Sequence, residues 1–193
     1  GPRTLEAINN QDCGWFYRAS AEDFEQIPGR PIAFWLSKNL LSTFSRFGTV
    51  RDIASTRKGM ATGNNDKFVR YAHEVSVAEI GRVTSRDDAT KSELKWFPYA
   101  NGGEYRKWFG NLGEVVNWEM DGHRLQTELH ESGRVRAVNL NLDYIFRSGL
   151  SWTSITSSKF SIRELPSGSL FSSASNALFT SGPTDTILAL LNS

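Results

Sequence analysis

Several features that define common protein classes are scarce or absent in this sequence. Its 193 residues include a single cysteine, Cys13, which excludes an internal disulfide framework and any zinc site built on cysteines. No apolar run is long enough to cross a bilayer, so we expect neither a membrane span nor a membrane partner. These absences favour a cytoplasmic protein, and the length allows one substantial domain or at most two small ones.

The motifs of common enzymes are also missing. The sequence contains no GxxxxGK[ST] loop, no GxGxxG after a strand, no GxSxG elbow and no HExxH. One weak pattern is Glu93-Leu94-Lys95, which together with Asp87 and Asp88 leaves open a nuclease-like magnesium site. The spacing is poor, and we therefore predict that this chain has no catalytic residues.

A second weak pattern is the histidine pair in "GHRLQTELHES". His123 and His130 lie among carboxylates, an arrangement that would suit a metal cluster. The stretch is better interpreted as an exposed helix. We expect no metal site.

Positively and negatively charged residues are concentrated in different segments of the chain, although the net charge is only +1. Residues 46–70 carry six cations and two anions, a balance of +4, whereas residues 114–131 carry five anions and one cation, a balance of −4. A basic segment is commonly just a solvated face, and the same asymmetry is also expected of a surface that meets phosphates. The +4 segment is thus a candidate contact surface for a polyanion.

The order of the expected elements indicates an α+β fold. Ser20, followed by acidic residues, predicts a helix start, and Pro31 and Gly48 are expected to bound a longer helix. The expected strands cover 15–17, 50–53, 68–75, 114–118, 150–157, 160–165 and 168–173, and a helix covers 183–192. Short strands mixed with helices in this order predict an irregular, largely antiparallel sheet with flanking helices.

Two segments have clear expectations of their own. Apolar residues recur at helical spacing in the longer helix and predict its core face: Ile32, Trp35, Leu36, Leu40, Phe44 and Phe47. Residues 55–67, "STRKGMATGNNDK", combine two glycines with an Asn-Asn-Asp run, so they are expected to form a long basic loop.

Several stretches together resemble a known family. They are "IASTRKGMATGNNDKFVR", "KWFPYANGGEYRKWFGN", "VVNWEMDG", "LSWTSITSSKFSIRELPSG" and "ILALLNS". They resemble the C-terminal target recognition domain of the PglX methyltransferases of BREX phage-defence systems, of the kind also found in TaqI-like and type IIG adenine-specific DNA methyltransferases. "GWFYRASAEDFEQIPGRPIAFWLSKNL" resembles the segment that follows the catalytic domain in that family. One departure is Asn65, where the family usually has Asp.

The resemblance implies a division of the chain and a missing catalytic part. Residues 1–2 are interpreted as a tag remnant, 3–48 as a helical connecting segment and 49–193 as a TaqI-like target recognition domain. In such enzymes an S-adenosylmethionine site and a catalytic Asn-Pro-Pro-Tyr motif belong to an N-terminal Rossmann-like domain, and neither motif occurs here. The fragment is therefore expected to bind no cofactor and to catalyse nothing, while reading duplex DNA for a methyltransferase domain in cis.

The resemblance also predicts DNA contacts on three polar stretches. Cations beside the flexible Asn101-Gly102-Gly103 are expected at phosphates, because glycine lets the backbone approach closely. Asn64 and Asn65 are expected to identify adenine in the major groove, unless they only cap a turn. The expected contact residues are Arg57, Lys58, Thr62, Asn64, Asn65, Lys67, Lys95, Tyr99, Asn101, Arg106, Lys107, Trp108, Ser154, Thr156, Ser157 and Lys159.

Some aromatic side chains of residues 95–111 are expected to be buried in the core, and others are expected to contact DNA. The stretch is too charged for a buried strand and too aromatic for a plain loop, so a partner should lie against it. Trp96, Phe97 and Phe109 are expected in the core, whereas Tyr99 and Trp108 are expected to reach the DNA.

Another class of function remains open at this point. A protein-interaction module with an aromatic, basic loop would dock an acidic partner, such as another BREX subunit or a phage DNA mimic, by the same charge complementarity. Sequence preference among duplexes distinguishes a DNA reader from such a module, and metal-dependent cleavage would identify the nuclease.

Overall fold

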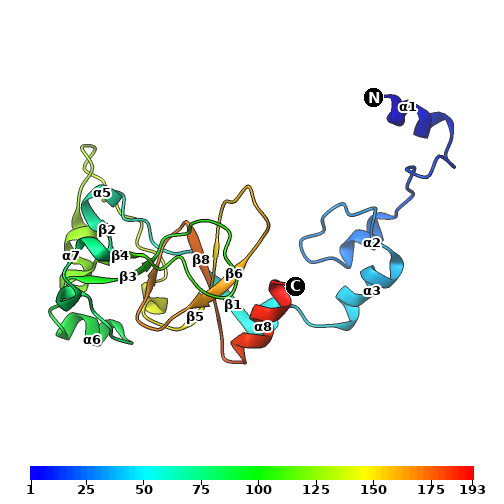
Figure 1. Ribbon diagram of the computed structural model, residues 1–193. Coiled ribbons are helices and arrows are strands. Elements are labelled where there is room, and N and C mark those ends of the chain that lie inside the picture. Colours follow the sequence, from blue (N-terminus) through cyan, green and yellow to red (C-terminus); the bar gives the residue numbers. More distant parts are fainter. The chain divides into compact units, whose positions relative to one another are not determined.

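The computed structural model describes residues 1–193, which divide into two units between Asp52 and Ile53 (Figure 1). The first unit contains the helices α1 (Pro2–Asn9), α2 (Ala21–Glu25) and α3 (Lys38–Arg46). Its small core consists of Ile27, Ala33 and Leu41, with Leu36 packed against them. A one-turn helix, α4 (Val50–Ile53), spans the division, which the sequence placed after residue 48.

The helices of the first unit are shorter than the sequence predicts. The start at Ser20 is confirmed, since its hydroxyl accepts a hydrogen bond from the N–H of Glu22 at 3.3 Å. The long helix from Pro31 is wrong, because α3 begins only after Ser37, whose hydroxyl accepts from the N–H of Leu40 at 3.3 Å. The expected core face is mostly exposed, at Ile32, Trp35, Leu40, Phe44 and Phe47, since only Leu41 of α3 joins the core.

Two predicted strands are also wrong. Residues 15–17 form no strand, and the indole N–H of Trp15 donates to the carbonyl of Arg3 at 3.0 Å. Residues 50–53 are helical because the Asp52 carboxylate accepts from both the N–H and the hydroxyl of Thr49, at 2.6 and 3.1 Å. These bonds hold the pKa of Asp52 below its usual value.

Residues 53–193 contain two four-stranded sheets, which confirms the α+β fold with largely antiparallel strands (Figure 1). The first sheet has the order β1 (Ala54–Arg57), β8 (Ser175–Thr180), β5 (Gly149–Thr153), β6 (Ile162–Leu165), all antiparallel. The second has the order β2 (Val69–Tyr71), β4 (Glu114–Asn117), β3 (Trp96–Ala100), β7 (Leu170–Phe171). Of these strands only β3 and β7 pair in parallel.

Short helices complete the second unit. They are α5 (Asn65–Phe68), α6 (Arg86–Lys91), α7 (Glu119–Thr127) and α8 (Thr184–Leu191), with 3-10 turns at Ala72–Glu74, Val77–Glu79 and Leu142–Tyr144. The predicted C-terminal helix is thus confirmed. The predicted loop 55–67 is partly regular, because it begins in β1 and ends in α5. The exposed helix predicted after residue 121 ends at Thr127, and its Leu125 is fully buried.

One continuous apolar core joins the two sheets. Phe97 of β3 meets Phe146 edge to face at 5.4 Å, and Phe171 of β7 lies 5.6 Å from Phe179 of β8. Burying such a ring contributes about 1.5–3 kcal/mol, so a few of these contacts fix one sheet against the other. The loops at the junction of the sheets therefore have defined positions.

Candidate nucleic-acid interface

Polar stretches from distant parts of the sequence meet at one series of hollows in the second unit. The first hollow, about 400 Å³, is lined by residues 60–65, which run from the loop after β1 to the start of α5, by Tyr99 and Asn101, and by residues 172–174 before β8. A second hollow of about 350 Å³ and a third of about 200 Å³ adjoin it, because Asn101 lines all three. We call these three hollows the trough.

The wall formed by residues 59–62 is held by backbone hydrogen bonds. The N–H of Met60 donates to the carbonyl of Phe171 at 3.1 Å, and the N–H of Ser173 donates to the carbonyl of Met60 at 2.8 Å. A Cβ on Gly59 would lie 2.2 Å from the Phe171 carbonyl oxygen, so only glycine allows this approach. The wall of the first hollow is therefore fixed to β7 and its continuation.

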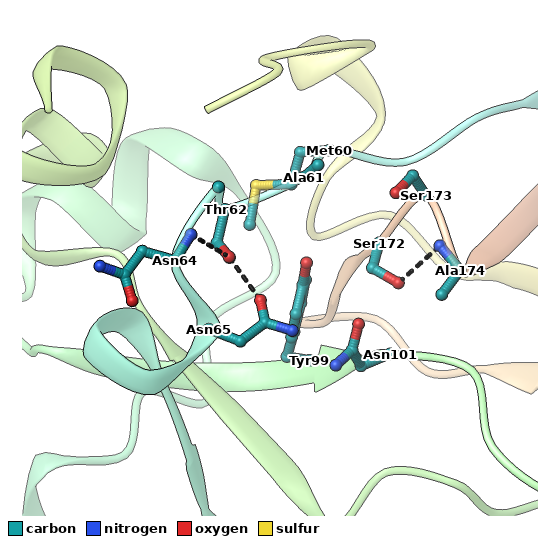
Figure 2. A pocket seen from close by; sticks show the side chains of 11 residues that line it. Met60, Ala61, Thr62, Asn64, Asn65, Tyr99, Asn101, Ser172, Ser173 and Ala174 are labelled. Carbon is teal, nitrogen blue, oxygen red and sulfur yellow. Dashed lines mark hydrogen bonds between the residues drawn. The ribbon is translucent and has the colours of Figure 1, made fainter. Parts of the chain in front are cut away.

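The two neighbouring asparagines have different orientations. The side-chain oxygen of Asn64 accepts from the N–H of Lys67 at 3.2 Å and caps α5, which is the turn-capping role left open by the sequence. Asn65 instead accepts a hydrogen bond from the Thr62 hydroxyl through its side-chain oxygen. Figure 2 shows the amides of Asn65 and Asn101 beside Tyr99, with the amide of Asn64 turned away. Asn65 therefore faces the trough, and Asn64 stabilises the helix.

Two of the expected contact residues form the floor of the first hollow. Thr62 is 2% exposed and Tyr99 is 1% exposed. Burial raises the pKa of the Tyr99 phenol, and a hydrogen bond with Ser172 partly offsets that rise. Because the core encloses its ring, Tyr99 does not present that ring to a ligand, which corrects the prediction that it reaches the DNA.

The cations of the β1–α5 region differ in how freely they reach solvent. Arg57 lies over the Tyr144 ring at 4.4 Å and donates to the Tyr144 hydroxyl at 2.6 Å. Lys58 is exposed, while its carbonyl accepts from the Asn141 amide at 2.8 Å. Lys67 pairs with Glu128, and this pairing lowers the pKa of Glu128. Lys67 is thus already engaged, and Lys58 is the free cation beside the first hollow.

The aromatic side chains of residues 95–111 are buried and exposed only partly as predicted. Trp96 and Phe97 are buried in β3, as expected, and Lys95 lies 5.3 Å from the Trp96 ring. Phe109 is 57% exposed rather than part of the core, because it follows the turn at Trp108, which has a φ of 71°. Trp108 itself is exposed, as its predicted DNA role requires.

Arg106 and Lys107, the two cations of this loop, differ in whether a group of the protein already binds them. Arg106 is exposed and lies against Gly110, whose missing Cβ leaves room for it. The ammonium of Lys107 donates to the carbonyl of Asn192 at the end of α8, so it ties the loop to that helix. Arg106 is free to meet a ligand, whereas Lys107 has a structural partner.

The hydroxyl-rich stretch after β5 borders both ends of the trough. Ser154 contacts the wall of the first hollow, since its hydroxyl donates to the carbonyl of Ser173 at 2.9 Å. Thr156 and Lys159 line a small depression that shares Gly103 with the third hollow. Ser157 and Lys159 are exposed. The structure therefore brings the three predicted stretches to one surface.

Sequence reasoning missed several residues of the trough. They are Asp66, Arg70, Tyr71, Glu74, Asn111, Glu114 and Ser172. Most lie on β2, on β4 or beside these strands, and their approach to Asn101 depends on the pairing of β2 and β3 with β4. No local sequence signal marks such a neighbourhood.

No group of three or more His, Cys, Asp or Glu side chains is arranged to hold a metal ion. None of the helices has both the length and the apolar character that crossing a membrane would need.

Comparison with known proteins points to one class, the adenine-specific methyltransferases. No protein-family model matches the chain. The adenine-specific methyltransferase PglX of Lacticaseibacillus casei (strain Zhang) is 38% identical over 194 residues, which cover 98% of this chain and 16% of that protein. The adenine-specific methyltransferase BrxX of Escherichia coli O9:H4 (strain HS) is 36% identical over 192 residues, which cover 96% of this chain and 14% of that protein. The chain is therefore similar, along nearly all of its length, to a segment that makes up 16% of one relative and 14% of the other, consistent with a fragment of their family.

Proposed function

We propose that residues 53–193 are the DNA-binding target recognition domain of an adenine-specific DNA methyltransferase that acts in BREX phage defence. The domain grips duplex DNA and reads a short sequence, so that a catalytic domain elsewhere in the parent chain can flip the target adenine out of the stack. The similarity to one segment of two adenine-specific methyltransferases supports the class of enzyme.

The observation that carries the proposal is the convergence of three distant stretches on the trough. Amides from residues 65 and 101 lie inside it, and exposed cations such as Lys58 and Lys159 belong to the segments that border it. Amides and carboxylates read base edges, as arginine and lysine do at guanine, and cations and hydroxyls also hold phosphates. A surface that offers both kinds of group side by side suits a groove of duplex DNA.

Methyl transfer itself is assigned to another part of the parent chain. These 193 residues contain neither a glycine-rich cofactor loop nor an Asn-Pro-Pro-Tyr tetrapeptide. S-adenosylmethionine therefore belongs to the catalytic domain, and this segment binds the DNA and recognises its sequence. Calorimetric titration of the chain with S-adenosylmethionine is expected to give no saturable heat.

DNA binding is tested with the 193-residue chain and labelled duplexes by fluorescence anisotropy. Affinity should fall steeply with salt, with a log–log slope of about −0.9 for each phosphate contact. Arg106→Ala should reduce that slope by about one contact and weaken binding to all duplexes equally. Arg82→Ala, an exposed arginine outside the three stretches, serves as the matched control. A response that is flat with salt would contradict the proposal.

A second candidate is protein docking through the aromatic loop. Tyr105, Trp108 and Phe109 are 43%, 53% and 57% exposed, and neighbouring exposed rings are typical of protein interfaces. An acidic partner, such as another BREX subunit or a phage DNA mimic, would suit the nearby cations. In this case binding to duplexes would show no sequence preference.

A further inference from the structure

Glu114 occupies a fixed position inside the trough. It is the first residue of β4 and pairs with Tyr71 of β2 on one side and with Tyr99 of β3 on the other. Its side chain lines both the second and the third hollow. Because two strands hold its backbone, the direction of its carboxylate is set by the sheet.

The carboxylate of Glu114 lacks a partner in the protein. One of its oxygens, Oε2, is buried and accepts no hydrogen bond. An unsatisfied buried acceptor is costly, more so when it belongs to a charged group, so native proteins rarely keep one without a reason. A ligand that brings a hydrogen-bond donor into the trough would give this carboxylate a partner that the protein does not provide.

The charged residues around Glu114 determine which charge a ligand of the trough should carry. The second hollow contains the acidic residues Asp66, Glu74 and Glu114 against a single cation, Arg70. An Nη atom of Arg70 donates to the carbonyls of Asp66 and Val69, both at 2.6 Å. Such a surface repels phosphate, and a neutral ligand with N–H donors is favoured.

The neighbouring amides fit the same kind of ligand. Asn65 and Asn101 line the second hollow with Glu114, and the oxygen of Asn65 is occupied by Thr62. Figure 2 shows the Asn65 and Asn101 amides directed into the adjoining first hollow. Asparagine pairs with the adenine edge in the major groove, and glutamate accepts from the N4 amino group of cytosine.

We propose that Glu114 accepts a hydrogen bond from the exocyclic amino group of a base, a cytosine within the recognised sequence. This inference rests on the proposed function, because it requires a DNA groove to lie over the trough. Beyond the proposed function, the inference names a specificity-determining residue at the β4 end of the trough. It also names the chemical group on the base that this residue recognises. Glu114 thereby excludes thymine, which presents a carbonyl oxygen where cytosine has its amine.

The test begins with selection of preferred duplexes from a randomised library by the 193-residue chain. Glu114→Gln keeps the shape of the side chain and replaces a pure acceptor with a group that also donates. We expect this variant to lose about 5- to 150-fold discrimination at one position, corresponding to 1–3 kcal/mol, with other positions unchanged. Glu79→Gln makes the same chemical change on an exposed residue outside the trough and should keep the full preference.

Modified duplexes identify the amino group without changing the protein. Replacing the selected cytosine with 2-pyrimidinone removes only its amine and should weaken wild-type binding, with little further effect on Glu114→Gln. If the loss appears instead with purine in place of adenine, the assignment to cytosine is overturned and the recognised amino group is that of adenine. Should Glu114→Gln select the same sequence as Glu79→Gln, the inference is overturned while DNA reading survives. If the wild-type chain binds no duplex, both proposals fail.

Discussion

Asn64 and Asn65 are adjacent in the sequence and differ in what their side chains do. Asn64 caps α5, whereas Asn65 faces the trough. We expect Asn64→Ala to lower the free energy of unfolding by about 1 kcal/mol, because α5 loses its cap. Urea unfolding followed by circular dichroism measures this change.

The companion variant Asn65→Ala should differ from Asn64→Ala in its effect on base preference. Asn65 is exposed at the first position of a one-turn helix, but its oxygen accepts from the buried Thr62 hydroxyl, so its removal should lower the free energy of unfolding by about 1 kcal/mol. Its loss should also relax the preference for one base pair in the duplex selection, which Asn64→Ala should leave unchanged. If Asn64→Ala relaxes the preference and Asn65→Ala does not, the two roles are exchanged.

Arg163 on β6 is an unusual buried residue. It is 1% exposed, its Nη2 donates to the Thr153 hydroxyl at 3.2 Å, and its Nη1 has no partner. Burial lowers the pKa of this guanidinium, and the nearby Arg106 lowers it further. No carboxylate pairs with Arg163.

A buried cation without an anion costs stability, so removing it should help the fold. We expect Arg163→Met to raise the free energy of unfolding by about 1 kcal/mol or more, since methionine fills similar space without a charge. Arg163→Ala is the control and should be less stable than Arg163→Met, because it leaves a void. A thermal melt compares the variants, and a large loss in Arg163→Met would show that the guanidinium stabilises the fold.

At the scale of elements, one side chain fastens α8 to the edge strand of a sheet. β6 is the last strand of its sheet, and Asn192 follows α8. The Asn192 amide donates to the carbonyl of Ile162 at 2.7 Å, and its oxygen accepts from the N–H of Ile162 at 3.1 Å. Asn192 thus satisfies an edge backbone that would otherwise lack partners.

We expect Asn192→Ala to lower the free energy of unfolding by about 1–3 kcal/mol, because it leaves buried backbone groups of Ile162 unpaired. Ser193→Ala is the matched control at the next position, where the exposed hydroxyl bonds only to the carbonyl of Leu190. Amide hydrogen exchange should report faster exchange at the Ile162 N–H in Asn192→Ala. Equal stability of the two variants would contradict this assignment.

At the scale of the whole molecule, the two units differ in the size of their cores. Residues 1–52 bury three apolar side chains in one small core, whereas the buried apolar side chains of residues 53–193 form one large continuous core and a smaller one beside α8. A chain that begins at Ile53 should therefore unfold cooperatively, within a few degrees of the full chain. Residues 1–52 alone should show no cooperative transition.

Calorimetric melting of the two fragments checks this expectation. Binding of the larger fragment to duplex DNA should match that of the full chain, because the trough lies wholly within it. If the larger fragment aggregates or loses binding, the first unit has a role in recognition that its small core does not suggest.

Local signals determined several parts of this protein. Ser20 is followed by acidic residues and begins a helix, and the apolar run of α8 forms a helix, because caps and helical periodicity act within a few residues. The α+β class and the strand β4 were also predictable from short apolar segments between turns. The three stretches that border the trough were recognised from their residue types and their resemblance to a methyltransferase family.

Tertiary structure decided the rest. The helical spacing from Ile32 to Phe47 could not reveal that so little of the first unit is available to cover those side chains. Tyr99 was expected to be exposed and is buried, because β3 pairs with β4. Phe109 was expected in the core and is exposed, because it follows the turn at Trp108. Glu114 entered the trough through its pairing with Tyr71 and Tyr99. Contacts between residues far apart in the sequence depend on the whole packed arrangement of the chain, and a local pattern does not contain them.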